Sequence, residues 1–312
     1  MQSVLDYLNE IKGEGGFVKD SKAVLPELIG NSEANHWVPG AFEGILLRSN
    51  VNMNKPFFVN YALFLKTKRA INSGREKAKN DLCDSLMKYS AITITDPILA
   101  NMKNRVNKEK TLSFARDLFK TTVRAEIAKF AIGLLGEYGT EEDLPDLILI
   151  SSHEEFTLFG CVALKNILNR AGKPYNGTIL SLCGHTFGWG KIAAVRELDF
   201  TLPETRDYLL SSGCRNDIAL SHLSNVCAIK GKLLSYLKKA LSEEAEFDEA
   251  HLYGICDIWE GFCDKDHLEN DSITDYPDYA EAFELFRQAV EKYGYSNNER
   301  VIKVIKAVMP EA

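Results

Sequence analysis

The stretch Gly188-Trp189-Gly190-Lys191-Ile192-Ala193 has the spacing G-x-G-x-x-A, with which dinucleotide-binding proteins hold a pyrophosphate on backbone N–H groups. That chemistry needs a strand running directly into the first glycine and a second strand that ends in a ribose-binding acid. Here four residues separate the apolar run 178–183 from Gly188, and Asp207 falls inside a helix that Pro203 is expected to open. The sequence therefore favours a turn in which the two glycines let two helices approach closely.

Other motifs for catalysis or metal binding are incomplete. The chain has no G-x-S-x-G, no G-x-x-x-x-G-K, no H-E-x-x-H and no C-x-x-C pair. The acidic run 264–271 begins like a calcium-binding loop, but Leu268 and Glu269 stand where a ligand and a glycine are required. Glu154 and Glu155 beside His153 are expected to begin a helix, where acids meet the positive end of its dipole. We therefore expect no metal and no cofactor, and a non-catalytic role is favoured, although a site built from distant segments would leave no such motif.

The elements that carry these residues read as helices. Tyr279, Phe283, Phe286, Val290 and Tyr293 alternate in steps of four and three, which predicts one apolar helix face, and 156–167 follows the same rule. Further helices are expected around 57–71, 81–89 and 301–308. The extended patterns at 91–95 and 178–183 lack partners at hairpin or crossover spacing, so no sheet is expected.

Four short windows repeat along the chain. They begin at Ala131, Ala163, Ala194 and His222, and each has a small or medium residue, an aliphatic residue, two variable positions and another aliphatic residue. Their separations of 32, 31 and 28 residues leave room for a turn and one further helix. This period predicts helix pairs that bury their apolar faces by stacking on one another.

With these windows, the run from about 123 to 240 resembles HEAT/armadillo-type α-solenoids, including bacterial HEAT-like proteins, although its repeats are shorter than standard HEAT units. The resemblance implies an all-α fold, an α-α superhelix of the HEAT-like solenoid kind. Residues 1–122 are expected to form a less regular helical N-terminal region, either a cap or divergent repeats. Residues 123–312 would hold the HEAT-like helical repeats and an acidic C-terminal part.

Composition favours a folded, reduced protein. The 312 residues are 45% hydrophobic and carry a net charge of −7. The first residues include acidic and polar side chains before any apolar run long enough for a signal peptide, and no run of about 18 apolar residues follows. The seven cysteines are an odd set inside helical patterns, which indicates reduced core residues. A cytoplasmic protein without membrane attachment is expected.

Solenoids commonly bind a protein or peptide on their concave face, and we take this as the leading functional hypothesis. Trp189 is expected either to fill a gap between repeats or to form an exposed stacking platform. The acidic segment 241–281, with 14 Asp and Glu against Lys265, would be a second surface for a basic partner. The candidate residues for the concave face are Trp189, Lys191, Arg196, Arg206, Arg215 and Asn216.

The alternative is a nucleic-acid-binding or DNA-repair protein similar to the HEAT-like glycosylases. Residues 48–129 carry 17 Lys and Arg against 7 Asp and Glu, and aromatic residues precede the basic run. In this case Trp189 would stack on a base and Asp199 or Asp217 would supply a carboxylate. The net negative charge of the chain opposes this alternative. Its basic patch would consist of Lys66, Lys68, Arg69, Arg75, Lys77 and Lys79.

Overall fold

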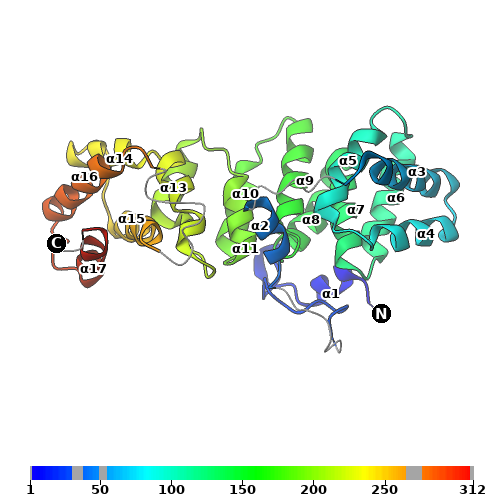
Figure 1. The fold of residues 1–312 in the computed structure, drawn as a ribbon, viewed down its shortest axis with the longest axis horizontal. Helices are drawn as coiled ribbons and strands as arrows, with labels where there is room; N and C mark the ends of the chain where they lie inside the picture. Colours follow the sequence, from blue (N-terminus) through cyan, green and yellow to red (C-terminus); the bar gives the residue numbers. More distant parts are fainter. Residues whose placement is uncertain (1, 30–37, 49–54, 265–275, 310–312) are drawn as a thin grey trace. The chain divides into compact units, whose positions relative to one another are not determined.

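The computed structural model describes residues 2–29, 38–48, 55–264 and 276–309, and over these residues the chain is all-helical (Figure 1). They form 17 α-helices and four short 3-10 or π turns without any β-strand; an isolated bridge joins Lys12 and Val18. The prediction of an all-α fold without a sheet is therefore confirmed for this part of the chain. None of the described helices is long and apolar enough to cross a membrane.

The chain divides into two compact units, Met1–Glu197 and Leu198–Ala312. Residue 122, the boundary expected from the sequence, lies inside the first of these units. The helices of the first unit are α1 (Val4–Glu10), α2 (Ala41–Arg48), α3 (Phe57–Ser73), α4 (Glu76–Leu86), α5 (Ala91–Met102), α6 (Lys108–Thr121), α7 (Ala125–Tyr138), α8 (Leu144–Ser151), α9 (Thr157–Arg170), α10 (Asn176–His185) and α11 (Trp189–Arg196). Those of the second are α12 (Pro203–Tyr208), α13 (Ser224–Lys230), α14 (Leu233–Leu241), α15 (Glu249–Phe262), α16 (Tyr279–Lys292) and α17 (Glu299–Val308).

Consecutive helix pairs organise the later part of the first unit. Helix α6 packs on α7, α8 on α9, and α10 on α11, while α9 contacts both α7 and α11 (Figure 1). The windows at Ala131, Ala163 and Ala194 begin in α7, α9 and α11, the second helices of these pairs, and the third window extends two residues beyond α11. The window at His222 departs from this pattern, because it begins in a single 3-10 turn, Leu220–His222, and continues into α13 of the second unit.

The two stretches with extended patterns are helical. In α5, the buried residues Ala91, Ile94, Ile98 and Met102 recur in steps of three and four, so burial follows the helical period. The hydroxyl groups of its threonines bond to backbone carbonyls one turn earlier, for example Thr95 Oγ1 to Ala91 O at 2.8 Å. Residues 178–183 lie in α10 for the same reason, with Ile179, Leu182 and Cys183 buried. Tertiary burial thus overrides the β-propensity of these segments.

Small residues let the paired helices approach closely. A Cβ atom added to Gly136 of α7 would lie 3.0 Å from the Cα of Ala163 on α9. A Cβ atom on Gly160 of α9 would overlap the Oγ of Ser151 on α8 at 1.7 Å. Backbones at this distance leave no room for larger side chains, so the small residues fix the spacing of α7, α8 and α9.

The second unit is built around α15. This helix contacts α13, α17 and the short turns Leu209–Gly213 and Leu220–His222. Trp259 is fully buried and meets Phe283 of α16 edge to face, with ring centroids 5.0 Å apart. Phe286 and Val290 are buried on the same helix, which confirms the apolar face expected for 279–293. Trp259 also lies near Tyr279 and Phe286, so aromatic rings pack between α15 and α16.

Replacing Gly136 with valine should lower the free energy of unfolding by about 1–3 kcal/mol, because its side chain would press on the backbone of α9. The matched control is Gly184→Ala in α10, where nothing lies within 4 Å of the added Cβ and a gain of up to about 1 kcal/mol from helix propensity is expected. Urea unfolding of both variants measures the difference. Equal stabilities would show that α7 and α9 are not closely packed.

Candidate functional site

A large cavity lies in the first unit and has a volume of about 840 Å³. Its walls come from residues 22–29, 38–43, 87–90, 125–129 and 153–155. Five of its apolar side chains are exposed, a feature typical of ligand sites because an ordinary core would bury them. We call this cavity the cleft; its exposed apolar side chains are Val24, Ile29, Val38, Phe42 and Met87.

A buried lysine and three glutamates form the polar part of the cleft. Lys129 Nζ donates to Glu43 Oε1 at 2.5 Å, to Glu126 Oε1 at 2.8 Å and to Glu155 Oε1 at 2.5 Å. The lysine side chain is 1% exposed, whereas those of Glu126 and Glu155 are 26% and 23% exposed. These four residues are named the Lys129 cluster, and all three ammonium donors are used within it.

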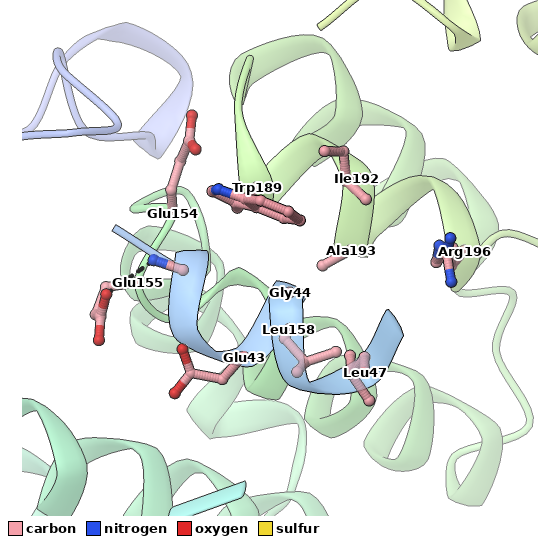
Figure 2. A pocket seen from close by; sticks show the side chains of 11 residues that line it. Glu43, Gly44, Leu47, Glu154, Glu155, Leu158, Trp189, Ile192, Ala193 and Arg196 are labelled. Atoms are coloured by element: carbon pink, nitrogen blue, oxygen red, sulfur yellow. Dashed lines mark hydrogen bonds between the residues drawn. The ribbon is translucent and has the colours of Figure 1, made fainter. Parts of the chain in front are cut away.

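Backbone donors hold two of the three carboxylates. Ala91 N donates to Glu126 Oε2 at 2.5 Å, and Gly40 N donates to Glu155 Oε2 at 2.9 Å, the bond drawn as a dashed line in Figure 2. Glu43 Oε2 is buried and has no hydrogen-bond partner. Figure 2 shows the carboxylates of Glu43 and Glu155 turned to the same side of α2. The cluster therefore contains one acceptor without a donor.

Three separate segments bring the cluster together. Glu126 and Lys129 lie one turn apart on α7, Glu43 comes from α2, and Glu155 precedes α9. His153 positions the last segment, because its Nε2 donates to Ala23 O at 2.7 Å while its Nδ1 accepts from Glu155 N at 3.3 Å. This pattern assigns the neutral imidazole with the proton on Nε2. Burial lowers the pKa of His153, consistent with that assignment.

The charged groups of the Lys129 cluster shift one another's pKa values. Burial alone would lower the pKa of Lys129, but the carboxylates of Glu43, Glu155 and Glu126 outweigh it and raise that pKa well above its ordinary value. Burial raises the pKa of Glu43, helped by the negative charge of Glu155 and opposed by Lys129. The lysine is thus a permanent cation, and burial favours the protonated form of Glu43.

Backbone N–H groups at the G-x-G-x-x-A stretch bind a carboxylate of the chain itself, that of Glu154. Glu154 is 2% exposed, and its carboxylate accepts from the N–H groups of Phe187 at 3.1 Å, Gly188 at 2.9 Å and Gly190 at 3.3 Å. These donors lie at the start of α11, where the helix dipole favours negative charge. The N–H groups that would bind a phosphate in a dinucleotide-binding turn are therefore bonded to the Glu154 carboxylate. Its side chain caps α11 instead of the helix that follows it in sequence, contrary to the expectation for residues 153–155.

Trp189 packs against α2. A Cβ atom on Gly44 would lie 2.1 Å from its ring, and one on Gly40, where φ is +74°, would lie 3.2 Å from its Cβ. Trp189 is only 8% exposed, so it fills a gap in the interior and is not an exposed stacking platform. The remaining cavity beside it, shown in Figure 2, has a volume of about 20 Å³. Such a space holds about one water molecule, too little for a nucleotide.

The other concave-face candidates are divided between the two units. Lys191 is buried and Arg196 is exposed in the first unit. In the second unit, Arg206 Nε donates to Phe200 O at 3.0 Å and Arg215 Nε lies 3.3 Å from Asp257 Oδ2. Asn216 accepts from the N–H groups of residues 218 and 219 within a turn. These contacts give Arg206, Arg215 and Asn216 structural roles within their own unit.

The basic patch lies on α3 and α4 and is partly neutralised. Lys66 Nζ lies 3.1 Å from Asp81 Oδ1, and Lys79 Nζ lies 2.6 Å from Asp117 Oδ2. Arg69, Arg75 and Lys77 are exposed, and Lys68 is half-buried. Of the preceding aromatic residues, Phe64 is buried while Phe57, Phe58 and Tyr61 are exposed. Ion pairing reduces the charge that this patch offers to a phosphate backbone.

Sequence motifs did not reveal the Lys129 cluster. Its three glutamates are the described group whose side-chain oxygens lie close enough to hold a metal ion, within 4.8 Å of one another, but they are far apart in sequence. One signal was available: Lys129 lies in α7, where ten of 14 residues are buried, and a lysine in such a helix requires buried partners. Residues 265–271 of the calcium-loop-like run lie outside the described residues.

Comparison with protein-family models, with curated proteins and with solved structures found no match to this chain.

Replacing Lys129 with methionine should reduce the free energy of unfolding at pH 7 by about 3–5 kcal/mol, because one buried and two partly buried carboxylates would lose their cation. The deficit should shrink at pH 5. Folding raises the pKa of Glu43, so the folded state becomes less stable as pH rises through that pKa and Glu43 ionises. Without Lys129, which lowers the pKa of Glu43, this loss of stability with rising pH should be larger. Urea unfolding at both pH values measures this. The control Lys173→Met breaks an exposed ion pair with Glu141 and should cost less than about 1 kcal/mol; an equal loss in both variants would contradict the role of burial.

Replacing Glu154 with glutamine should cost about 1–3 kcal/mol, because the new NH₂ group cannot accept from the backbone donors of α11. Glu142→Gln, at a side chain that is 81% exposed, should change stability by less than about 0.5 kcal/mol. Thermal unfolding of both variants gives the comparison. A Glu154→Gln protein as stable as the control would mean that the carboxylate does not cap α11.

Proposed function

We propose that the chain is a helical-repeat scaffold of the HEAT-like superhelical kind whose first unit binds a segment of a partner protein in the cleft. The observation that carries the proposal is a cavity of about 840 Å³ with exposed apolar walls. A peptide that inserts apolar side chains there would remove these walls from water, and each buried side chain contributes roughly 1.5–3 kcal/mol before ordering costs.

The chemistry of the walls favours a peptide over a nucleotide. Phe42, Met87 and Val38 present apolar surface, and methionine adapts its shape to different partners. Phosphate groups would meet three carboxylates of the Lys129 cluster, whose charge repels them. Nucleic-acid binding on α3 and α4 has less support, because Lys66 and Lys79 already pair with acids.

The proposal is tested by selecting peptides from a random library on the immobilised full chain. The selected peptides should lose about tenfold or more in affinity when Met87 is replaced with aspartate, since the substitution puts a charge into the apolar wall. Leu65→Asp is the matched control, because Leu65 on α3 is 47% exposed against 40% for Met87 and lies outside the cleft. Fluorescence anisotropy measures both affinities. Failure to select any peptide, or equal losses in both variants, would refute binding in the cleft.

A further inference from the structure

The Lys129 cluster carries more negative than positive charge. Three glutamates surround one lysine, so the cluster has a formal charge of −2 when all four groups are ionised. Charges removed from water are costly unless they are paired and hydrogen-bonded. Lys129 has no further donor to give, and Glu43 Oε2 still has no partner although Glu43 is 97% buried. The excess negative charge points to a missing cationic group, and the unpartnered Glu43 oxygen shows that the polar groups of the cluster are not fully satisfied from within the chain.

A metal ion does not fit the centre of this cluster. Lys129 Nζ already lies 2.5–2.8 Å from one oxygen of each glutamate. A divalent ion bound to the same oxygens would be placed against a buried ammonium, and like charges at that distance repel strongly. The missing cation must therefore approach from the side of the cluster that remains open.

The open side faces the cleft. Glu126 and Glu155 line the cavity, and about a quarter of each side chain is accessible. One oxygen of each is bonded to Lys129 and the other to a backbone N–H, but each carboxylate oxygen has a second lone pair for another donor. A cation at this point would be held by charge-assisted hydrogen bonds in a partly desolvated place.

The remaining charges of the cleft leave this preference intact. Glu27 is already bonded to Ala125 N at 2.7 Å and lies 3.6 Å from Arg124. Lys22 and Lys88 also line the cavity; Lys22 is half-buried, and Lys88 is exposed, where water and salt screen its charge. The largest formal charge in the cleft is therefore the −2 of the ionised Lys129 cluster, against single charges at Lys22, Lys88 and Glu27.

We propose that the cleft recognises a lysine side chain of the bound protein segment, with its ammonium placed between Glu126 and Glu155 and its methylene chain against the apolar wall. A primary ammonium is compact and has three donors on a flexible apolar stem. Its arrival changes the formal charge of the cluster from −2 to −1. This inference rests on the proposed function for the peptide, while the ammonium site itself is testable without one.

The test uses hexylammonium chloride as a lysine mimic, with hexan-1-ol and hexanoate as probes of equal chain length. Each is titrated into the ¹⁵N-labelled full chain, and the N–H signals of Gly40 and Ala91 report on Glu155 and Glu126. Hexylammonium should bind about tenfold more tightly than hexanol, shift both signals and weaken with added salt, while hexanoate should not bind. Equal affinity for hexanol, or shifts confined to other parts of the chain, would overturn the proposal.

Two variants distinguish binding of the ammonium at Glu126 and Glu155 from a general attraction to negative charge. Glu126→Gln should weaken hexylammonium binding about tenfold, because one of the two receiving carboxylates is lost. Glu137→Gln, on the same helix but outside the cleft, should leave it unchanged. If both variants lost the same hexylammonium affinity, long-range attraction to negative charge would explain the binding, and the site would be refuted.

The peptide selection distinguishes this inference from the proposed function. Selected peptides that depend on Met87 but lack lysine would refute the ammonium site and leave peptide binding in place. Binding of hexylammonium without any selected peptide would support the ammonium site and refute the peptide-binding function.

Discussion

The first unit depends on a buried ammonium that joins three parts of the chain. Lys129 of α7 donates hydrogen bonds to Glu43 of α2 and to Glu155 of the segment before α9. Helix α2 has only eight residues, too few to be stable by itself, so its position depends on tertiary contacts. The ion pairs with Lys129, the bond from Gly40 N to Glu155 and the packing of Gly44 on Trp189 supply those contacts. A buried ion network adds little net stability, but it permits few alternative arrangements.

The same network shapes the cleft. Apolar walls alone would accept many ligands, whereas fixed carboxylates add direction and charge preference. Because Lys129 is fully buried and its pKa is raised, its ammonium group remains available to the carboxylates over a wide range of pH. The cleft therefore combines adaptable side chains such as Met87 with a rigid polar end, a combination suited to recognising one anchor residue in a variable segment.

Helical periodicity was sufficient to predict the all-α fold and several individual helices, because burial on one face leaves a regular pattern in sequence. The repeat windows located α7, α9 and α11 for the same reason. The cluster was not predictable in this way, since Glu43 lies 86 residues from Lys129 and no local pattern links them. The missing strand argued against a dinucleotide-binding turn at Gly188, but nothing local indicated that Glu154 would accept hydrogen bonds from its N–H groups. Contacts between distant segments set the site, and periodicity carries no information about them.

Glu154 and Glu155 are neighbours in sequence but serve different elements, since the first caps α11 and the second bonds to Lys129 and to the residue before α2. Inserting or deleting a single amino acid in 153–155 would misalign both carboxylates at once, whereas a point substitution affects one. This stretch should therefore tolerate changes of chain length less well than changes of residue type, and comparison of natural variants would find its length constant even where its composition differs.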